Sequence, residues 1–95
     1  MADHRPSVER LEAAQSFPGT YQIKAIGEAG EDFAARVIAT VVRELDSPED
    51  LTHSLRTTQG GNHVALTLDL RVQTAEQVRT IYAKIHELKG LVLLL

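Results

Sequence analysis

Two different spacings of hydrophobic and polar residues divide the first half of the chain into extended and helical segments. From Thr20 to Gly27, apolar and polar side chains alternate roughly in period two, which predicts a β-strand. From Asp32 to Leu45 the apolar residues recur every three or four positions, which predicts an amphipathic helix. The turn-forming cluster from Asp46 to Asp50 contains a proline, so the helix should end before it.

The second half of the chain carries the same two signals in another order. Strands are predicted for residues 51–58 and 63–72, and a pair of glycines between them indicates a β-hairpin. Residues 74–77 have the pattern of a capping box, in which side chains satisfy amide groups at the start of a helix. This helix should end at Gly90, a residue that favours helix termination.

Five aliphatic residues follow Gly90 and predict a last strand, because they are too few for the ~20 that a membrane span needs. The order is then strand, helix, strand, strand, helix, strand. Right-handed crossovers arrange this order as an α+β, ferredoxin-like βαββαβ sandwich over residues 17–95. We expect a four-stranded antiparallel sheet of order 4-1-3-2 with two helices on one face. Residues 1–16 form an N-terminal arm with room for a short helix.

A two-residue hairpin loop determines which side chains share a face of this sheet. With Gly60 and Gly61 in the loop, Leu55 lies opposite Leu66 and His53 lies opposite Leu68. The aliphatic side of the third strand then lies beneath the helices. The other face is either a solvated surface or a surface for a ligand or partner. It should carry Gln22, Lys24, Ser54, Arg56, Thr58, His63, Ala65, Thr67, Asp69 and Arg71.

All side chains of the last predicted strand are apolar, so those that do not face the helices need another surface to cover them. Strict alternation sends Val92 and Leu94 to one face, and the leucines at 91, 93 and 95 to the other. Only one of these sets can lie beneath the helices. The other set should be covered by the N-terminal arm, which contributes Val8, Leu11 and Phe17, or by a second subunit.

Composition narrows the possible functions. The 95 residues are 43% hydrophobic and 24% charged, which is typical of one folded domain with a modest core. A net charge of -3 disfavours nucleic acid, and residues 63–72 offer no aromatic side chain besides His63 on which bases could stack. The chain has no cysteine and no signal-peptide pattern near its N-terminus, so we expect a cytoplasmic protein without disulfides.

The sequence contains no arrangement of residues that is typical of a catalytic site. His53 and His63 should lie five positions apart on paired strands and point to opposite faces, so they cannot share a metal ion. Neither GxxxxGK[ST] nor GxGxxG occurs, and no nucleophile has a base within reach. We therefore expect no enzyme activity, no cofactor and no metal site, and no binding to nucleic acid or membranes.

Five short motifs occur in this order along the chain: Phe17-Pro18, Tyr21-Gln22-Ile23-Lys24-Ala25-Ile26-Gly27, Thr57-Thr58-Gln59-Gly60-Gly61-Asn62-His63, Glu76-Gln77-Val78 and Ile81-Tyr82. By their order and spacing they resemble the YbeD-like family, and the match extends from about Leu11 onward. The resemblance implies a small bacterial domain of unknown function with an ACT-like, ferredoxin-like fold. Its members are often encoded near lipoate-attachment genes, which implies a link to lipoate metabolism. In this chain Gly60 stands where the family usually has a basic residue, and His63 replaces an aromatic residue.

ACT-like domains usually bind ligands between paired domains, near the loop after the first strand, which corresponds here to residues 27–30. Our first hypothesis is a non-enzymatic regulatory or small-ligand-binding domain that acts as a homo-oligomer. The alternative is a protein-interaction adaptor that uses the sheet face or a sheet edge. The candidate ligand-binding residues are Lys24, Gly27, Gly30, Arg56, Thr58, Gly61 and His63.

Overall fold

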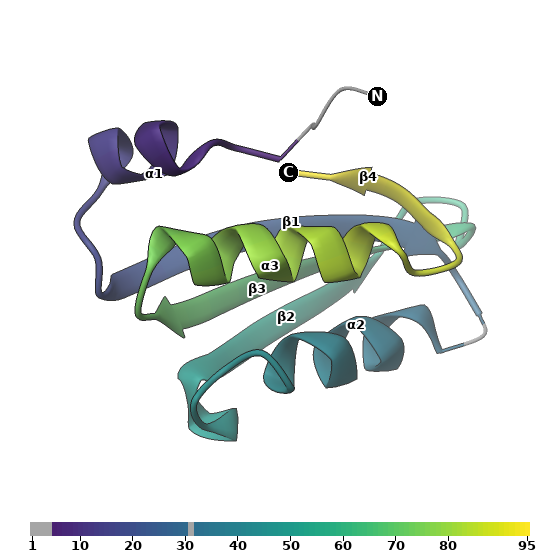
Figure 1. Cartoon of the computed structure of the whole chain (residues 1–95). Coiled ribbons are helices and arrows are strands. Elements are labelled where there is room, and N and C mark those ends of the chain that lie inside the picture. Colours follow the sequence, from purple (N-terminus) through teal and green to yellow (C-terminus); the bar gives the residue numbers. More distant parts are fainter. Residues whose placement is uncertain (1–4, 31) are drawn as a thin grey trace.

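A computed structural model describes residues 5–30 and 32–95 and contains a four-stranded antiparallel sheet (Figure 1). The strands lie in the order β2-β3-β1-β4, which confirms the predicted order 4-1-3-2 and the α+β, ferredoxin-like arrangement. The elements are α1 (Val8–Ala14), β1 (Gly19–Glu28), α2 (Phe33–Val42), a short 3-10 helix η1 (Pro48–Asp50), β2 (Leu51–Thr57), β3 (His63–Val72), α3 (Ala75–His86) and β4 (Leu91–Leu94).

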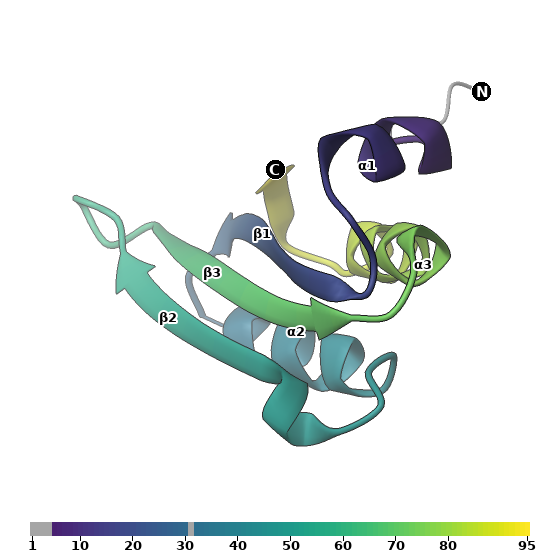
Figure 2. The same ribbon diagram turned by 90° about the vertical axis from the view of Figure 1, so that its left-hand side faces the viewer.

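Helices α2 and α3 cover one face of the sheet and leave the other face open (Figures 1 and 2). The predicted hairpin register is confirmed, because Leu55 lies opposite Leu66 and His53 lies opposite Leu68. Side chains directly opposite each other in an antiparallel pair point to the same face. The register therefore sets the content of both faces of β2 and β3.

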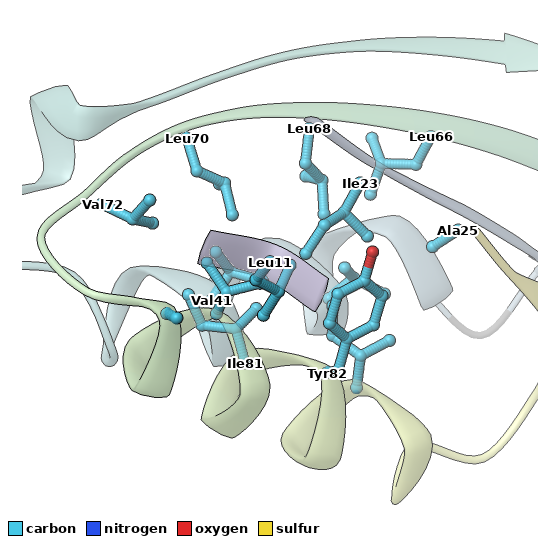
Figure 3. Packing of buried hydrophobic residues seen from close by; sticks show 14 of the residues in the cluster. Leu11, Ile23, Ala25, Val41, Leu66, Leu68, Leu70, Val72, Ile81 and Tyr82 are labelled. Carbon is cyan, nitrogen blue, oxygen red and sulfur yellow. The ribbon is translucent and has the colours of Figure 1, made fainter. Parts of the chain in front are cut away.

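The hydrophobic core lies between the sheet and the helices (Figure 3). Strand β3 contributes every second residue from Leu66 to Val72, and these side chains are at most 1% exposed, which confirms the predicted buried face. Ile23 of β1 and Ile81 of α3 are fully buried beside them. Burial of this aliphatic layer is the main force that holds the helices on the sheet.

The start of α3 is capped by side chains from Thr74 and Gln77, as the capping-box pattern predicts. The Thr74 hydroxyl accepts a hydrogen bond from the Gln77 amide at 3.1 Å, and Gln77 Oε1 accepts one from the Gln73 amide at 2.6 Å. Gln77 Nε2 also donates to the carbonyl of Glu44 at 2.8 Å. Helix α2 ends at Val42, earlier than the predicted Leu45. The hydrogen bond from Gln77 to Glu44 therefore joins the turn after α2 to the start of α3.

Helix α1 lies beside α3, on the same side of the sheet as the other helices (Figure 2). Its Leu11 is 3% exposed and belongs to the core. The chain before α1 is bound to α3 as well, because Arg79 Nε donates to the carbonyl of Pro6 at 2.9 Å. The described part of the predicted arm therefore extends the helical layer and does not cross the open face. Residues 1–4 of that arm lie outside the described residues.

Candidate functional site

The open face of the sheet is polar along its centre, as the hairpin register predicts. Lys24 lies opposite Thr67, and Arg56 lies opposite Ala65. Across β1 and β3, Gln22 Nε2 donates a hydrogen bond to Asp69 at 3.0 Å. Antiparallel sheets often leave one face to water, so polarity alone does not define a site.

A hollow of about 620 Å³ on this face, called the open-face hollow below, brings two of the predicted site residues together. These are Lys24 and Arg56, which come from β1 and β2 on either side of β3. None of the described side chains that line it is acidic. The hollow thus combines two cations and two hydroxyls with apolar walls, a mixture suited to an anionic group with an apolar neighbour. Its lining residues are Lys24, Ile26, Ser54, Leu55, Arg56, Ala65, Leu66, Thr67 and Leu95.

Three other predicted residues, Thr58, Gly61 and His63, lie together in the hairpin between β2 and β3. The Thr58 hydroxyl donates to the His63 carbonyl at 3.0 Å and accepts from the His63 amide at 3.2 Å. The Gly61 amide donates to the Thr58 carbonyl at 2.9 Å, and Gly61 has a φ of 76°, in the region that favours glycine. These contacts close the turn, so the Thr58 hydroxyl stabilises the hairpin through its hydrogen bonds with the His63 backbone.

Of the last two predicted residues, Gly27 lies near the end of β1 and Gly30 lies in the loop that follows. The hairpin lies against this loop, because the Ala29 amide donates to the Asn62 carbonyl at 3.0 Å. Gly27, however, lies opposite Val64 and faces the helices rather than the open face. A shallow hollow of about 240 Å³ next to the loop is lined by Glu28, Ala29, Gly30, Arg36, Lys89 and Gly90.

The predicted alternation of β4 is wrong at one position, because the strand contains a bulge. Its register against β1 shifts between Ile26 and Gly27, so the strand has one extra residue there. Leu91 and Leu94 therefore both pack against the core, as partners of Gly27 and Ala25. Leu93 lies opposite Ile26 on the open face.

Side chains of β4 and its neighbour leave an apolar patch at one corner of the open face. Leu95 exchanges two backbone hydrogen bonds with Lys24, at 2.8 and 3.1 Å, which places its side chain on the open face beside Leu93. Leu93 is 45% exposed, Leu95 61% and the adjacent Val92 56%. We call Ile26, Leu93 and Leu95 the β4 patch. The described part of the N-terminal arm lies on the other side of the sheet and does not cover it.

A second apolar surface lies at the opposite edge of the sheet, and the sequence did not identify it. Leu55 faces the helix side of β2, but α2 does not reach over it, and its side chain is 53% exposed. Between α2 and β2 lies a groove of about 410 Å³, lined by Phe33, Ala34, Ala35, Ile38, Leu55 and Val64 with Glu28, Gly30 and Asp32 at its rim.

The described residues contain no group of three or more histidine, aspartate or glutamate side chains placed to hold a metal ion. His53 lies opposite Leu68 on the helix side, whereas His63 lies opposite Glu28 on the open face. The two rings are therefore separated as the register predicted. Among the same residues, no helix has the length and apolar character needed to cross a membrane.

Comparison with solved structures supports the fold. The solution structure of HP0495 from Helicobacter pylori superimposes with a TM-score of 0.60 and covers 85% of both chains. The sequence identity is 14%, so this likeness concerns the fold alone.

Comparison of sequences identifies relatives over most of the chain. A UPF0250 protein of Paraburkholderia phytofirmans is 35% identical over 72 residues, which cover 75% of this chain and 80% of the relative. A UPF0250 protein of Shewanella sediminis is 28% identical over 81 residues, which cover 85% of this chain and 90% of the relative. Residues 12–95 match the model of the family described as protein of unknown function (DUF493). The chain therefore belongs to the DUF493 family, which confirms its resemblance to the YbeD-like proteins.

Proposed function

We propose that this protein is a non-enzymatic binding module that forms a homo-oligomer through the open face of its sheet. The observation that carries the proposal is the β4 patch. Two of its members, Leu93 and Leu95, together with the adjacent Val92, are three of the four large hydrophobic side chains exposed among the described residues. Exposed apolar clusters on a small domain are typical of a surface that a partner covers.

A second copy of the chain is the occupant that the geometry favours. A two-fold pair uses the same patch on both partners, so two β4 patches can cover each other without another complementary surface. Pairing along the edge of β4 is disfavoured, because the strand is four residues long and bulged, and both features hinder edge pairing. The two copies should therefore meet through side chains of the open face.

The open-face hollow gives such a pair a place for a small regulatory ligand. It shares Ile26 and Leu95 with the β4 patch, so a ligand there would lie close to the second copy. Lys24 and Arg56 favour an anionic ligand. Lipoate and amino acids, which carry a carboxylate, are the first candidates of this kind.

Replacement of Leu93 by lysine should break the pair. A charged side chain in the centre of an apolar contact loses solvation without gaining a partner, so the dimer dissociation constant should rise by at least about tenfold. Sedimentation velocity over a range of concentrations measures this. Leu55→Lys is the matched control, since Leu55 is similarly exposed but lies on the helix side of β2. A wild-type chain that stays monomeric at every concentration, or an equal effect of both substitutions, would contradict the proposal.

The second candidate function is a protein-interaction adaptor, which the groove between α2 and β2 favours. Its floor is apolar, and Glu28 and Asp32 at its rim would attract basic residues. An amphipathic helix with basic flanks has the chemistry that suits such a groove.

The adaptor function predicts a stoichiometric partner in pull-downs from cell extract, and Leu55→Lys should abolish its capture. Here Leu93→Lys is the control, because it leaves the groove intact. Recovery of the chain with itself alone, or retention of the partner by Leu55→Lys, would count against an adaptor that uses this groove.

A further inference from the structure

A cavity of about 410 Å³ lies where α1, α3 and the end of β4 come together. Apart from Leu95, which it shares with the β4 patch, it is separate from the open face, because α1 and α3 lie on the helix side of the sheet (Figure 2). Half of its lining is apolar, and this volume is within the usual range for small-molecule sites. The apolar side chains are Pro6, Leu11, Ala14, Leu94 and Leu95.

The polar part of this cavity is basic. Arg5, Arg10 and His86 line it, and none of the other described side chains that do so is acidic. This grouping is unusual for a chain with a net charge of -3. Arg5 Nη1 donates to the Arg79 carbonyl at 3.4 Å, which places this side chain next to α3. Guanidinium groups with apolar surroundings are typical of sites that bind carboxylates.

Two tyrosines complete the lining. The hydroxyls of Tyr21 and Tyr82 are 3.2 Å apart, and their rings meet edge to face with centroids 6.2 Å apart. The hydrogen bond between them uses one of the two hydroxyl hydrogens, so the second can be donated to a ligand. Burial, and then the contact with Tyr21, raises the pKa of Tyr82, so this phenol keeps its proton at neutral pH.

We propose that this cavity binds a small monocarboxylate with an apolar body. The carboxylate lies against Arg5 and Arg10 and accepts a hydrogen bond from the tyrosine pair, while the body packs on Leu11 and Leu94. A bare phosphate ion would fit the basic side but would leave the apolar side uncovered. This site goes beyond the proposed function, because self-association uses the open face and the cavity shares only Leu95 with the β4 patch.

Titration with 4-phenylbutyrate, followed by amide NMR spectra of the full chain, tests this site. We expect shifts at α1, at α3 around Tyr82 and at the end of β4. The neutral 4-phenylbutyramide, which has the same body, should bind about tenfold more weakly because it lacks the charge that the arginines recognise. Arg10→Gln should weaken phenylbutyrate binding to a similar extent. Arg71→Gln on the open face is the matched control and should leave the affinity unchanged.

Several results would overturn the proposal. Equal affinity for the acid and the amide would show that the basic side is not used. Equal affinity for inorganic phosphate would show that the apolar side is not used. Shifts confined to Lys24 and Arg56 would move binding to the open-face hollow, and an unchanged affinity in Arg10→Gln would remove the arginine from the site. The same titrations can be made with the Leu93→Lys variant, because Leu93 does not line the cavity. Binding to the cavity can therefore be tested independently of self-association.

Discussion

Replacement of Leu11 by alanine should lower the free energy of unfolding by about 2–4 kcal/mol, the usual cost of a large-to-small change in a core. Leu11 is 3% exposed although it comes from the N-terminal arm, and it packs with the side chains beneath α3 (Figure 3). Small domains are stable by only about 5–15 kcal/mol. The melting temperature should therefore fall by on the order of 10 °C or more, which thermal unfolding followed by circular dichroism measures.

The control for this experiment is Leu55→Ala, the same chemical change at a side chain that is 53% exposed. It should cost less than about 1 kcal/mol, because little apolar area returns to water. If Leu11→Ala were no more costly than Leu55→Ala, α1 would not be packed stably on α3. The cavity between α1, α3 and β4 would then lose its wall, so this result bears on the carboxylate site as well.

The sheet could be predicted from sequence because its determinants are local. Two adjacent glycines set the loop between β2 and β3, and that loop alone determined that Leu55 lies opposite Leu66. Period-two alternation in β3 identified the buried face, and the capping pattern at Thr74 marked the start of α3. Each of these signals is contained within a few residues, and each agrees with the others.

The features that could not be predicted depend on contacts between distant segments. Every side chain of β4 is apolar, so the pattern contains no mark of the extra residue at the bulge opposite Ile26 and Gly27. The exposure of Leu55 depends on where α2 crosses the sheet, which its own sequence does not specify. Similarly, the pattern of the chain places His86 near the end of a helix, and only the placement of α1 shows that it lines a cavity with Arg10.

The candidate ligand residues include one whose role the structure ties to packing. Gly27 was selected because the loop after the first strand was expected at residues 27–30. In the structure it lies within β1 and faces α2, and a Cβ atom there would lie less than 3.0 Å from three atoms of the Phe33 ring. Phe33 is 2% exposed, and the Arg36 guanidinium lies 5.8 Å from its ring centroid on the outer side. The ring therefore has little freedom to move away from an added methyl group.

Gly27→Ala should consequently destabilise the fold by about 1–3 kcal/mol, the usual cost of inserting a group into a packed core. Chemical denaturation measures this loss. If the loss is caused by a steric clash with the Phe33 ring, a smaller side chain at residue 33 should reduce it. In a Phe33→Leu background, Gly27→Ala should therefore lower the free energy of unfolding by at least about 1 kcal/mol less than in the wild type. If Gly27 instead served to bind a ligand, Gly27→Ala should leave the stability unchanged and weaken ligand binding. Additive losses in the double variant would show that the glycine is required for its backbone and not for the space it leaves to Phe33.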